Sequence, residues 1–393
     1  MPDPPGYPPA RALFNFSPQW FLIPQGTGII SVILHQLHYQ FGALRILAKT
    51  VWIYTIVLLA ISLFLYILRL IRYPREVGYE LRHNLIETSC LASIVITYTV
   101  IIQMVALQYG HTHGVAVGVY VLWWIAAFLS TLAIIAIPYV QLKLQPSGFD
   151  LVPPAILLPL IAALTCAAAG GAICTSAALS PRLQVPVIIV AYLLVGAGLA
   201  LALGFDAVIL FQHFSDQQPS PQKVWQDMIL CGPFGQGGFA LQILGGAVQK
   251  SFPAYARGTL LRAQAAGPIA AVSQFAGVLS WGFATFWWCF AIISILHTSA
   301  AQPGGFKSTT FSLGAWSLVF PWGVYTNCAV QLGKIMDSPA FDVWSTALLL
   351  MLVVIAIVNT LFTIKGIYTG KVLGLEHGWR DRGVYHDDDD KQA

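Results

Sequence analysis

Charged residues are scarce in this chain. Only 36 of its 393 residues are Asp, Glu, Lys or Arg, whereas 57% are hydrophobic and the mean hydropathy is +0.72. A soluble globular protein carries about a quarter charged residues, and they lie mostly on its surface. The composition therefore excludes most soluble folds and favours a polytopic, all-helical integral membrane protein whose surface is largely covered by lipid.

The chain also lacks the sequence features of nucleic-acid binding, metal binding and a cleavable signal. No run of Lys or Arg interleaves with aromatic residues, so nucleic acid is not an expected partner. The six cysteines stand singly, and His111 and His113 have no third ligand nearby, so we expect neither a metal nor another cofactor. Residues 1–17 lack the charged start and apolar core of a signal, so the first span is expected to target the chain.

Apolar stretches of about 20 residues, the length that crosses the hydrocarbon core, recur along the chain. We expect one transmembrane domain over 18–364, an N-terminal segment 1–17 and a C-terminal tail 365–393. The acidic run near the end is typical of a solvated tail or a tag remnant and is given no function. The ten expected spans are 18–37, 46–70, 87–109, 116–140, 154–178, 185–211, 232–249, 267–297, 309–333 and 342–364.

The basic residues predict the orientation of these spans. Thirteen of the 20 Lys and Arg residues fall in the segments that share a side with the termini, and seven fall on the other side. Because cytoplasmic segments carry the excess of positive charge, both termini are expected in the cytoplasm.

Proline and glycine are most frequent in the odd-numbered spans, although the third span has neither. Backbone irregularity is tolerated in a membrane only where it is buried in protein or lines a water-filled path. The pattern favours kinked odd helices inside, around a conduit, with smoother even helices against lipid; tight helix packing by small residues is the alternative. The residues concerned are Pro24, Gly26 and Gly28 in the first span, Gly170 and Gly171 in the fifth, Gly232, Pro233, Gly235, Gly237 and Gly238 in the seventh, and Pro321 in the ninth.

Few ionisable residues lie within the spans. Asp206 and His213 are seven residues apart on one helix face and could form a proton relay, or Asp206 could pair with a neighbouring helix. No Lys or Arg lies deep in a span. Gly232 and Pro233 are therefore expected to leave a helix N-terminus free, where backbone N–H groups would meet a passing anion.

Several motifs together resemble the tellurite-resistance/dicarboxylate transporter family, which includes slow anion channels. The resemblance runs from about residue 16 to 364 and rests on the order of four segments along the chain. They are Pro24-Gln-Gly-Thr-Gly28, Pro153-Pro154 with Gly170-Gly171, Gly232-Pro-Phe-Gly-Gln-Gly237 and Trp316-Ser-Leu-Val-Phe-Pro321.

The resemblance implies ten helices arranged as five helical hairpins around a central pore, three subunits per assembly, and no enzymatic activity. It also implies that Phe320, before Pro321, projects into the pore as a gate. Within the family, the first and seventh spans resemble fungal sulfite efflux pumps of the plasma membrane, with sulfite as the expected anion.

Two alternatives remain for the function. The third span departs from the expected pattern around Glu87, so a malate permease of the same family is one of them. An integral membrane enzyme is a more distant one, because it would need clustered His, Asp or Glu, and only scattered residues occur.

Overall fold

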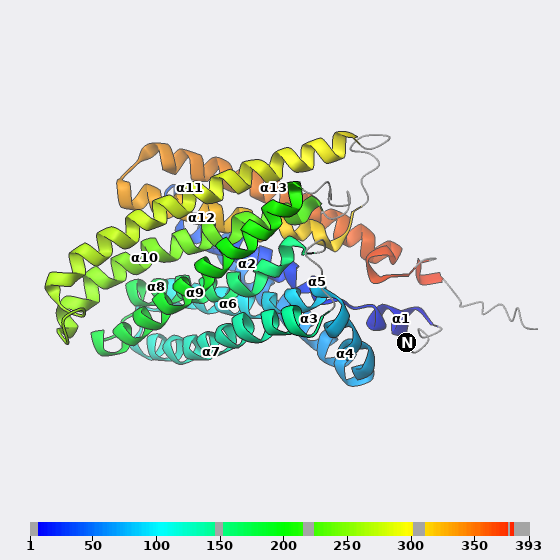
Figure 1. The fold of residues 1–393 in the computed structure, drawn as a ribbon, viewed down its shortest axis with the longest axis horizontal. Helices are drawn as coiled ribbons and strands as arrows, with labels where there is room; N and C mark the ends of the chain where they lie inside the picture. The colour runs from blue at the N-terminus through cyan, green and yellow to red at the C-terminus, as the bar shows by residue number, and fades with distance from the viewer. Residues whose placement is uncertain (1–6, 146–151, 215–223, 302–310, 376–377, 381–393) are drawn as a thin grey trace, which may run out of the picture.

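The computed structural model describes residues 7–145, 152–214, 224–301, 311–375 and 378–380. Within these ranges the regular structure is helical, which confirms the all-helical expectation, and the only β feature is an isolated bridge between Arg257 and Leu261. Eight helices in the described part are long and apolar enough to cross a membrane. They run side by side along the long axis of the molecule (Figure 1).

Five long helices, of 31 to 39 residues, form the outside of the bundle. α11, for example, buries only eight of its 39 residues, because apolar side chains on its other faces point outward. Such exposed apolar surface is stable only in contact with lipid. These outer helices are α3 (Gly42–Arg72), α7 (His113–Lys143), α9 (Pro181–Phe214), α11 (Ala263–Ala301) and α13 (Pro339–Thr369).

Five other helices form the inside. In α8 all residues from Leu158 to Cys174 are buried, and in α2 all residues from Leu22 to Leu34 are buried. Small residues make this possible, since Ala and Gly let helices approach one another closely. The inner helices are α2 (Leu22–Gln36), α6 (Ala92–Tyr109), α8 (Leu158–Ser176), α10 (Cys231–Tyr255) and α12 (Val319–Met336).

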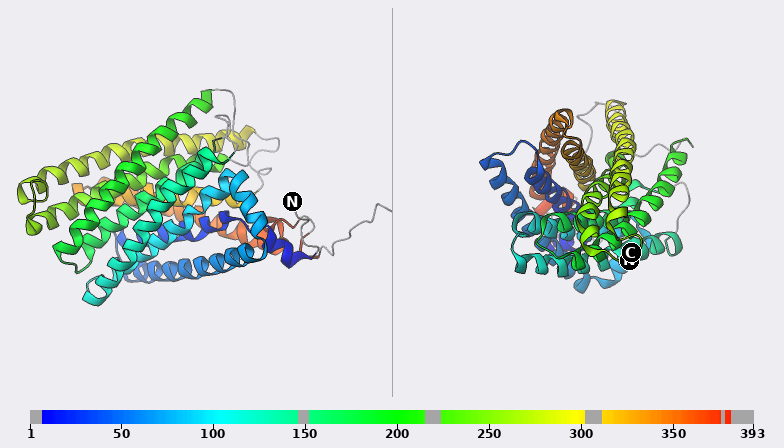
Figure 2. Two further views of the ribbon diagram at one scale, coloured as in Figure 1. Left: turned by 60° about the horizontal axis from the view of Figure 1, so that its bottom comes forward. Right: turned by 90° about the vertical axis from the view of Figure 1, so that its left-hand side faces the viewer.

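The inner helices form a closed ring in chain order. α2 contacts α6, α6 contacts α8, α8 contacts α10, α10 contacts α12, and α12 returns to α2. Each inner helix also packs against the outer helix that follows it in the chain. The end-on view in Figure 2 shows the helices arranged around this centre.

A short irregular helical segment precedes every inner helix. The five segments also contact one another in a closed ring, in the same order as the helices that they introduce. They are η1 (Pro18–Phe21), α5 (Leu85–Cys90), η3 (Pro154–Leu157), η4 (Val224–Leu230) and η6 (Leu313–Leu318).

Proline accounts for four of these starts. Pro24, Pro159, Pro233 and Pro321 are each the second or third residue of an inner α-helix, directly after a 3₁₀ segment. Proline has no N–H, so it is best tolerated in the first turn, where an N–H would lack an intrahelical acceptor. Proline therefore marks the change from 3₁₀ to α winding near one end of the span, whereas a kink within the span was expected.

The third span is interrupted without proline or glycine. α5 ends at Cys90, and the amides of Leu91 and Ile94 bond to carbonyls only three residues back. Nearby hydroxyls also take up backbone carbonyls: Thr88 Oγ1 donates to the Leu81 and Asn84 carbonyls, and Ser89 Oγ donates to the Leu85 carbonyl. Such side-chain bonds compete with regular helix winding.

Prolines inside the outer helices differ from expectation. Pro138 in α7, Pro186 in α9 and Pro268 in α11 all lie within helices that the sequence suggested were smooth. Each lies in the first or last two turns of a very long helix, so the central part that crosses the membrane stays regular.

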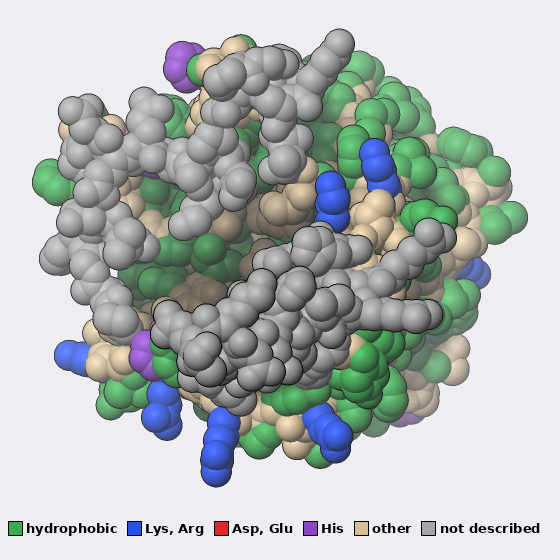
Figure 3. Space-filling model, turned by 90° about the vertical axis from the view of Figure 1, so that its right-hand side faces the viewer, with side chains coloured by type: hydrophobic (Ala, Val, Ile, Leu, Met, Phe, Trp, Pro, Cys, Tyr) green, Lys and Arg blue, Asp and Glu red, His purple; other side chains and the backbone are tan. Residues whose placement is uncertain are grey.

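Both described ends of the chain lie at the same end of the bundle. The helix α1 (Pro8–Phe14) contacts η7 (Lys371–Leu373) and η8 (Gly378–Arg380), and Asn15 Nδ2 donates to the Gly374 carbonyl at 3.2 Å. The amphipathic helix α4 (Pro74–His83) lies here too (Figure 1). Several Lys and Arg side chains lie on this face, most of them along its lower edge in Figure 3. We call it the terminal end of the bundle.

Candidate functional site

The contacts of α12 show which of its side chains face the axis of the ring. Val319 packs against Gly26 of α2, the carbonyl of Pro321 faces Cys231 of α10, and Trp322 Nε1 donates to the Leu348 carbonyl of α13 at 3.1 Å. Successive residues of an α-helix turn by about 100°. Phe320 therefore points between α2 and α10, away from the outer helix and toward the axis.

Phe320 is buried at this part of the axis. Its side chain is only 1% exposed and belongs to the continuous hydrophobic core. Asn327 lies seven residues further, on the same face of α12 and about 10 Å along it. Asn327 is also 1% exposed. The axis-facing side of α12 thus carries an aromatic ring near the terminal end and an amide closer to the middle.

Two more inner helices, α2 and α10, carry an amide side chain on the face that points toward the axis. On α2, Thr27 bonds to Thr55 of α3 at 2.8 Å, so Gln25, about 200° away, faces the axis. On α10, the Phe234 ring packs against Phe283 of α11 with centroids 4.5 Å apart, and Gln236 is again two residues away.

The remaining two inner helices place a polar residue on the same side by the same reasoning. On α6, the Tyr98 hydroxyl reaches the Leu122 carbonyl of α7, and Gln103 lies on the far side of the helix. On α8, Gly170 packs against Trp123 of α7, and Thr165 faces away from it. Each inner helix therefore contributes at least one uncharged polar side chain to the axis.

The four amides are buried but incompletely hydrogen-bonded. Within the described residues, no partner reaches one polar atom of each of Gln25, Gln103, Gln236 and Asn327. Leaving such a group unpaired costs about 1–3 kcal/mol. Amide groups can turn by 180° to present either the carbonyl oxygen or the NH₂ group. These positions can therefore bind water or a passing polar solute.

Glycines of the inner helices lie where neighbouring groups approach the backbone. A Cβ on Gly170 would be 2.9 Å from the Trp123 ring, and one on Gly237 would be 2.5 Å from Leu199 of α9. Both distances are shorter than a carbon–carbon contact allows, so these glycines permit close helix packing. The same kind of contact pairs Gly26 with Val319, Gly28 with Val100, Gly171 with Ile243, Gly232 with Ile161, Gly235 with Tyr325 and Gly238 with Cys328.

The free helix end expected at Gly232 and Pro233 is not found. η4 runs directly into α10, and Gly232 is the second residue of that helix, so helical backbone is continuous from Val224 to Tyr255. Gly232 does share a helix face with Gln236, because four residues make about one turn. Gly232 therefore lies on the axis-facing side of α10. The polar group on that side is the Gln236 amide and not a free helix end.

Asp206 and His213 lie on one side of α9 but do not touch. They are seven residues apart, or about 10 Å along the helix. Asp206 is 3% exposed, and among the described residues neither carboxylate oxygen has a hydrogen bond of good geometry, although the indole of Trp287 on α11 interacts with it. His213 is exposed and packs edge-on against Phe290, also on α11.

A third titratable residue lies beside this pair. Asp227 of η4 is 1% exposed, accepts a hydrogen bond from Ser294 Oγ at 2.6 Å, and interacts electrostatically with His213. Asp206 and His213 of α9 and Asp227 of η4 therefore all lie beside residues of α11.

A buried ion pair fixes the start of the first inner helix. Glu87 of α5 accepts a hydrogen bond from Ser17 and lies 3.8 Å from Arg69 of α3. The Ser17 hydroxyl also caps η1 by accepting from the Gln19 amide at 3.1 Å. Glu87 therefore links three chain segments and has a tertiary role.

The geometry described so far, a ring of buried helices around an uncharged polar axis, can be compared with known proteins. The model of the voltage-dependent anion channel family matches residues 15–364. The chain belongs to this family. The resemblance seen in the sequence is thus confirmed, and the chain is a multi-pass membrane anion transporter and not an enzyme.

Family members with curated names resemble the chain over most of its length. It is 29% identical over 338 residues to a sulfite efflux pump of Arthroderma benhamiae, covering 85% of this chain and 86% of the pump. It is 25% identical over 346 residues to a malic acid transport protein of Schizosaccharomyces pombe, covering 86% of this chain and 76% of that protein. An uncharacterized transporter of Methanocaldococcus jannaschii is 23% identical over 365 residues, covering 91% and 96%.

Sequence reasoning missed the axis amides and Asp227. The amides were overlooked because only ionisable residues were considered within the spans. Their signal was present: a lone Gln or Asn in an otherwise apolar span is also costly in lipid and so marks an inward-facing position. Asp227 was missed because the seventh span was expected to begin at Gly232, eight residues after the helical segment starts.

Proposed function

We propose that this family member exports sulfite or bisulfite across the plasma membrane, through a path along the axis of its inner-helix ring. Ten helices would span the bilayer as five hairpins, with η1–α2 and η6–α12 completing the eight long spans. The observation that carries the proposal is the closed ring of five buried helices with Phe320 and one uncharged polar residue per helix on its axis.

The axis would handle a small anion without binding it tightly. Amide groups of Gln25, Gln236, Asn327 and Gln103 lie at different depths along the ring, so the anion could exchange one set of hydrogen bonds for the next. Neutral donors stabilise an anion less than Lys or Arg would, which favours release. The glycines at positions 26, 28, 170, 171, 232, 235, 237 and 238, with Pro24, Pro233 and Pro321, would keep the helices at the spacing that the path requires.

Phe320 would act as the gate. An apolar ring at a constriction excludes water, and an ion cannot follow without its hydration shell or a substitute for it. Movement of the ring would open the path. Phe320 lies one residue into α12, next to Pro321 and the 3₁₀ segment η6, where the helix has the fewest regular backbone bonds to resist a shift.

Asp206, His213 and the neighbouring Asp227 would form a proton route beside the anion path. Uncompensated carboxylic acids within a membrane are commonly proton carriers. Such a route would couple sulfite export to a proton gradient, whereas a simple channel would not need it.

Sulfite is preferred over malate because the sulfite efflux pump of Arthroderma benhamiae is 29% identical to this chain, whereas the malic acid transport protein is 25% identical. The malic acid transport protein keeps C4-dicarboxylate transport as the second candidate. The deciding experiment compares the flux of sulfite, malate, nitrate and chloride into proteoliposomes that contain the purified full chain. Sulfite flux well above malate flux supports the proposal, and malate flux without sulfite flux overturns it in favour of the alternative.

The orientation and assembly need separate tests. We expect both termini in the cytoplasm, because several Lys and Arg side chains lie at the terminal end, and three subunits per assembly, as the family resemblance implies. Accessibility of an epitope at either terminus in intact cells tests the first expectation. Native mass spectrometry of the detergent-purified protein tests the second.

A further inference from the structure

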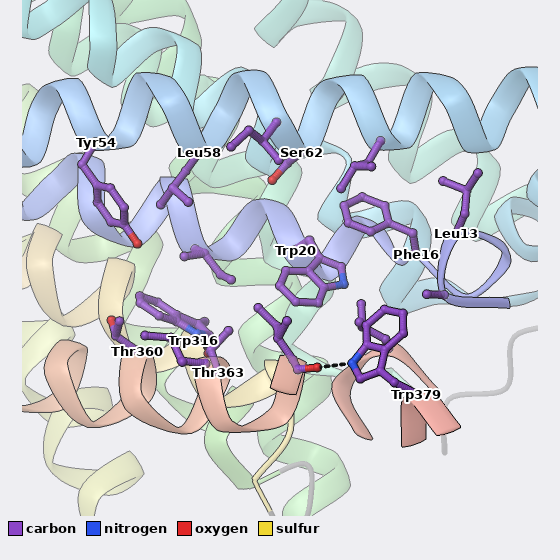
Figure 4. Close-up of a pocket in the computed structure, with 17 residues that line it drawn as sticks. Leu13, Phe16, Trp20, Tyr54, Leu58, Ser62, Trp316, Thr360, Thr363 and Trp379 are labelled. Atoms are coloured by element: carbon purple, nitrogen blue, oxygen red, sulfur yellow. Dashed lines mark hydrogen bonds between the residues drawn. The ribbon is translucent and has the colours of Figure 1, made fainter. Parts of the chain in front are cut away.

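A cavity of about 430 Å³ lies away from the axis, on the outer side of the bundle (Figure 4). α3 forms one wall and α13 the other, while Trp20 of η1 and Trp316 of η6 lie between them. Both tryptophans are largely buried, at 8% and 1% exposure, and form the floor. The cavity is therefore separated from the axis by the start of the first and last inner helices.

The rim of the cavity faces the hydrocarbon of the membrane. Tyr54 and Ile61 of α3 are 45% and 51% exposed, and Ile364 of α13 is 59% exposed. All three belong to helices that are long and apolar enough to span the bilayer. A molecule that enters through this rim must come from the lipid phase.

The length and depth of the cavity match one leaflet. Its lining on α3 runs from Tyr54 to Leu65, twelve residues that span about 16 Å of helix. Half of the hydrocarbon core is about 15 Å thick. The middle of α3 is Val57, so the cavity begins about one turn beyond the midpoint of this helix and extends toward the terminal end, mostly within one leaflet.

The lining offers almost no polar contact to an occupant. The hydroxyl of Thr360 donates to the Ala356 carbonyl, and that of Thr363 donates to the Asn359 carbonyl and accepts from Trp316 Nε1 at 2.9 Å. Most other lining residues are apolar or aromatic. A cavity of this size with apolar walls binds an apolar molecule.

The described segments nearest the two termini close the cavity at the membrane surface. Trp379 Nε1 donates to the Ile367 carbonyl at 2.8 Å, which holds the C-terminal segment across the end of α13, as Figure 4 shows. Leu13 of α1 and Leu373 of η7 complete this end. Tryptophan is typical of the membrane–water interface, so a lipid headgroup would lie beside Trp379.

We propose that this cavity binds one acyl chain of a phospholipid from the leaflet at the terminal end. The elongated shape, the leaflet-length depth, the apolar walls and the opening toward lipid all fit a single extended chain. Such a chain would contact Trp316, which lies one helical turn before Phe320 in the sequence.

The test uses the purified full chain in vesicles that contain phosphatidylcholine with a diazirine near the end of one acyl chain. Ser62→Trp and Leu58→Trp each place an indole in the cavity from α3. Leu201→Trp, on the lipid-facing side of α9, is the matched control. Thermal unfolding selects the variants that fold, and mass spectrometry maps the labelled peptides.

We expect label on residues 54–65 and 360–367 of the unsubstituted chain. It should fall about tenfold in either filled variant, equivalent to about 1.4 kcal/mol of binding free energy, and stay unchanged in Leu201→Trp. Equal labelling of all outer helices, or labelling that the filled variants retain, overturns the proposal. So does labelling of these residues by a photoreactive sterol but not by the phospholipid, or their cross-linking to a second copy of the chain.

Discussion

Removal of the Phe320 ring gives the sharpest test of the gate. The side chain is almost completely buried, and burial of a Phe side chain is worth about 1.5–3 kcal/mol. If opening requires the ring to leave this site, the closed state is favoured by a similar amount. Because about 1.4 kcal/mol corresponds to a factor of ten, Phe320→Ala should raise sulfite flux by about 10- to 150-fold.

A control variant must show whether a higher flux comes from removal of the gate or from looser packing of the helices. A Phe→Ala substitution in a core costs about 3–5 kcal/mol of folding stability, so Phe320→Ala will also lower the unfolding temperature. Phe21 suits the comparison, because it is 0% exposed but packs against Tyr66 of α3, with centroids 5.8 Å apart, away from the axis. Phe21→Ala should destabilise the protein to a similar extent without raising the flux.

The assay is sulfite efflux from proteoliposomes, normalised to the amount of folded protein in the membrane. The reasoning is refuted if Phe320→Ala transports no faster than the unsubstituted chain. It is also refuted if Phe21→Ala accelerates transport equally, since looser packing would then explain the gain.

Three further substitutions test other parts of the structure. Gly170→Ala should lower the free energy of unfolding by about 1–3 kcal/mol, because the new Cβ would overlap Trp123. The control Gly114→Ala, with open space around it, should change it little; chemical unfolding measures both. Gln236→Leu should lower sulfite flux about tenfold, through the loss of about 1–1.5 kcal/mol of hydrogen bonding, with little change in unfolding temperature; a large loss of stability would instead show a structural role. Asp206→Asn should remove the part of sulfite flux that a pH gradient drives and keep the part that membrane potential drives; unchanged gradient-driven flux would exclude Asp206 from a proton route.

Composition and the spacing of proline and glycine predicted much of the fold. The scarcity of charged residues was sufficient to predict a membrane protein, because a lipid-covered surface does not tolerate charged side chains. Proline distinguished four of the five inner helices, since each of these begins with a 3₁₀ segment before Pro24, Pro159, Pro233 or Pro321. The start of the fifth inner helix, α6 in the third span, could not be predicted from proline. Hydroxyl side chains such as Thr88 interrupt that span, and such residues are also common in regular helices.

The candidate site was less predictable. Phe320 came from a family motif, and nothing in its local sequence distinguishes it from a packed core residue such as Phe21. Which face of an inner helix meets the axis depends on contacts between distant segments, such as Val319 with Gly26 or Gly171 with Ile243. The sequence contains the amides, but only these contacts show that one polar residue from each inner helix faces a common centre.

The ring of five helices comes from a single chain, and this frees it from a constraint that applies to channels built from identical subunits. In a symmetric oligomer every substitution is repeated at the same height in each subunit, so a pore residue always forms a complete ring. Here each wall of the axis is encoded separately. If the proposed path follows this axis, one phenylalanine would close it alone, and a change in Gln25, Gln103, Gln236 or Asn327 would alter it at one depth only. Anion preference would then depend on single substitutions, each acting at one depth of the axis.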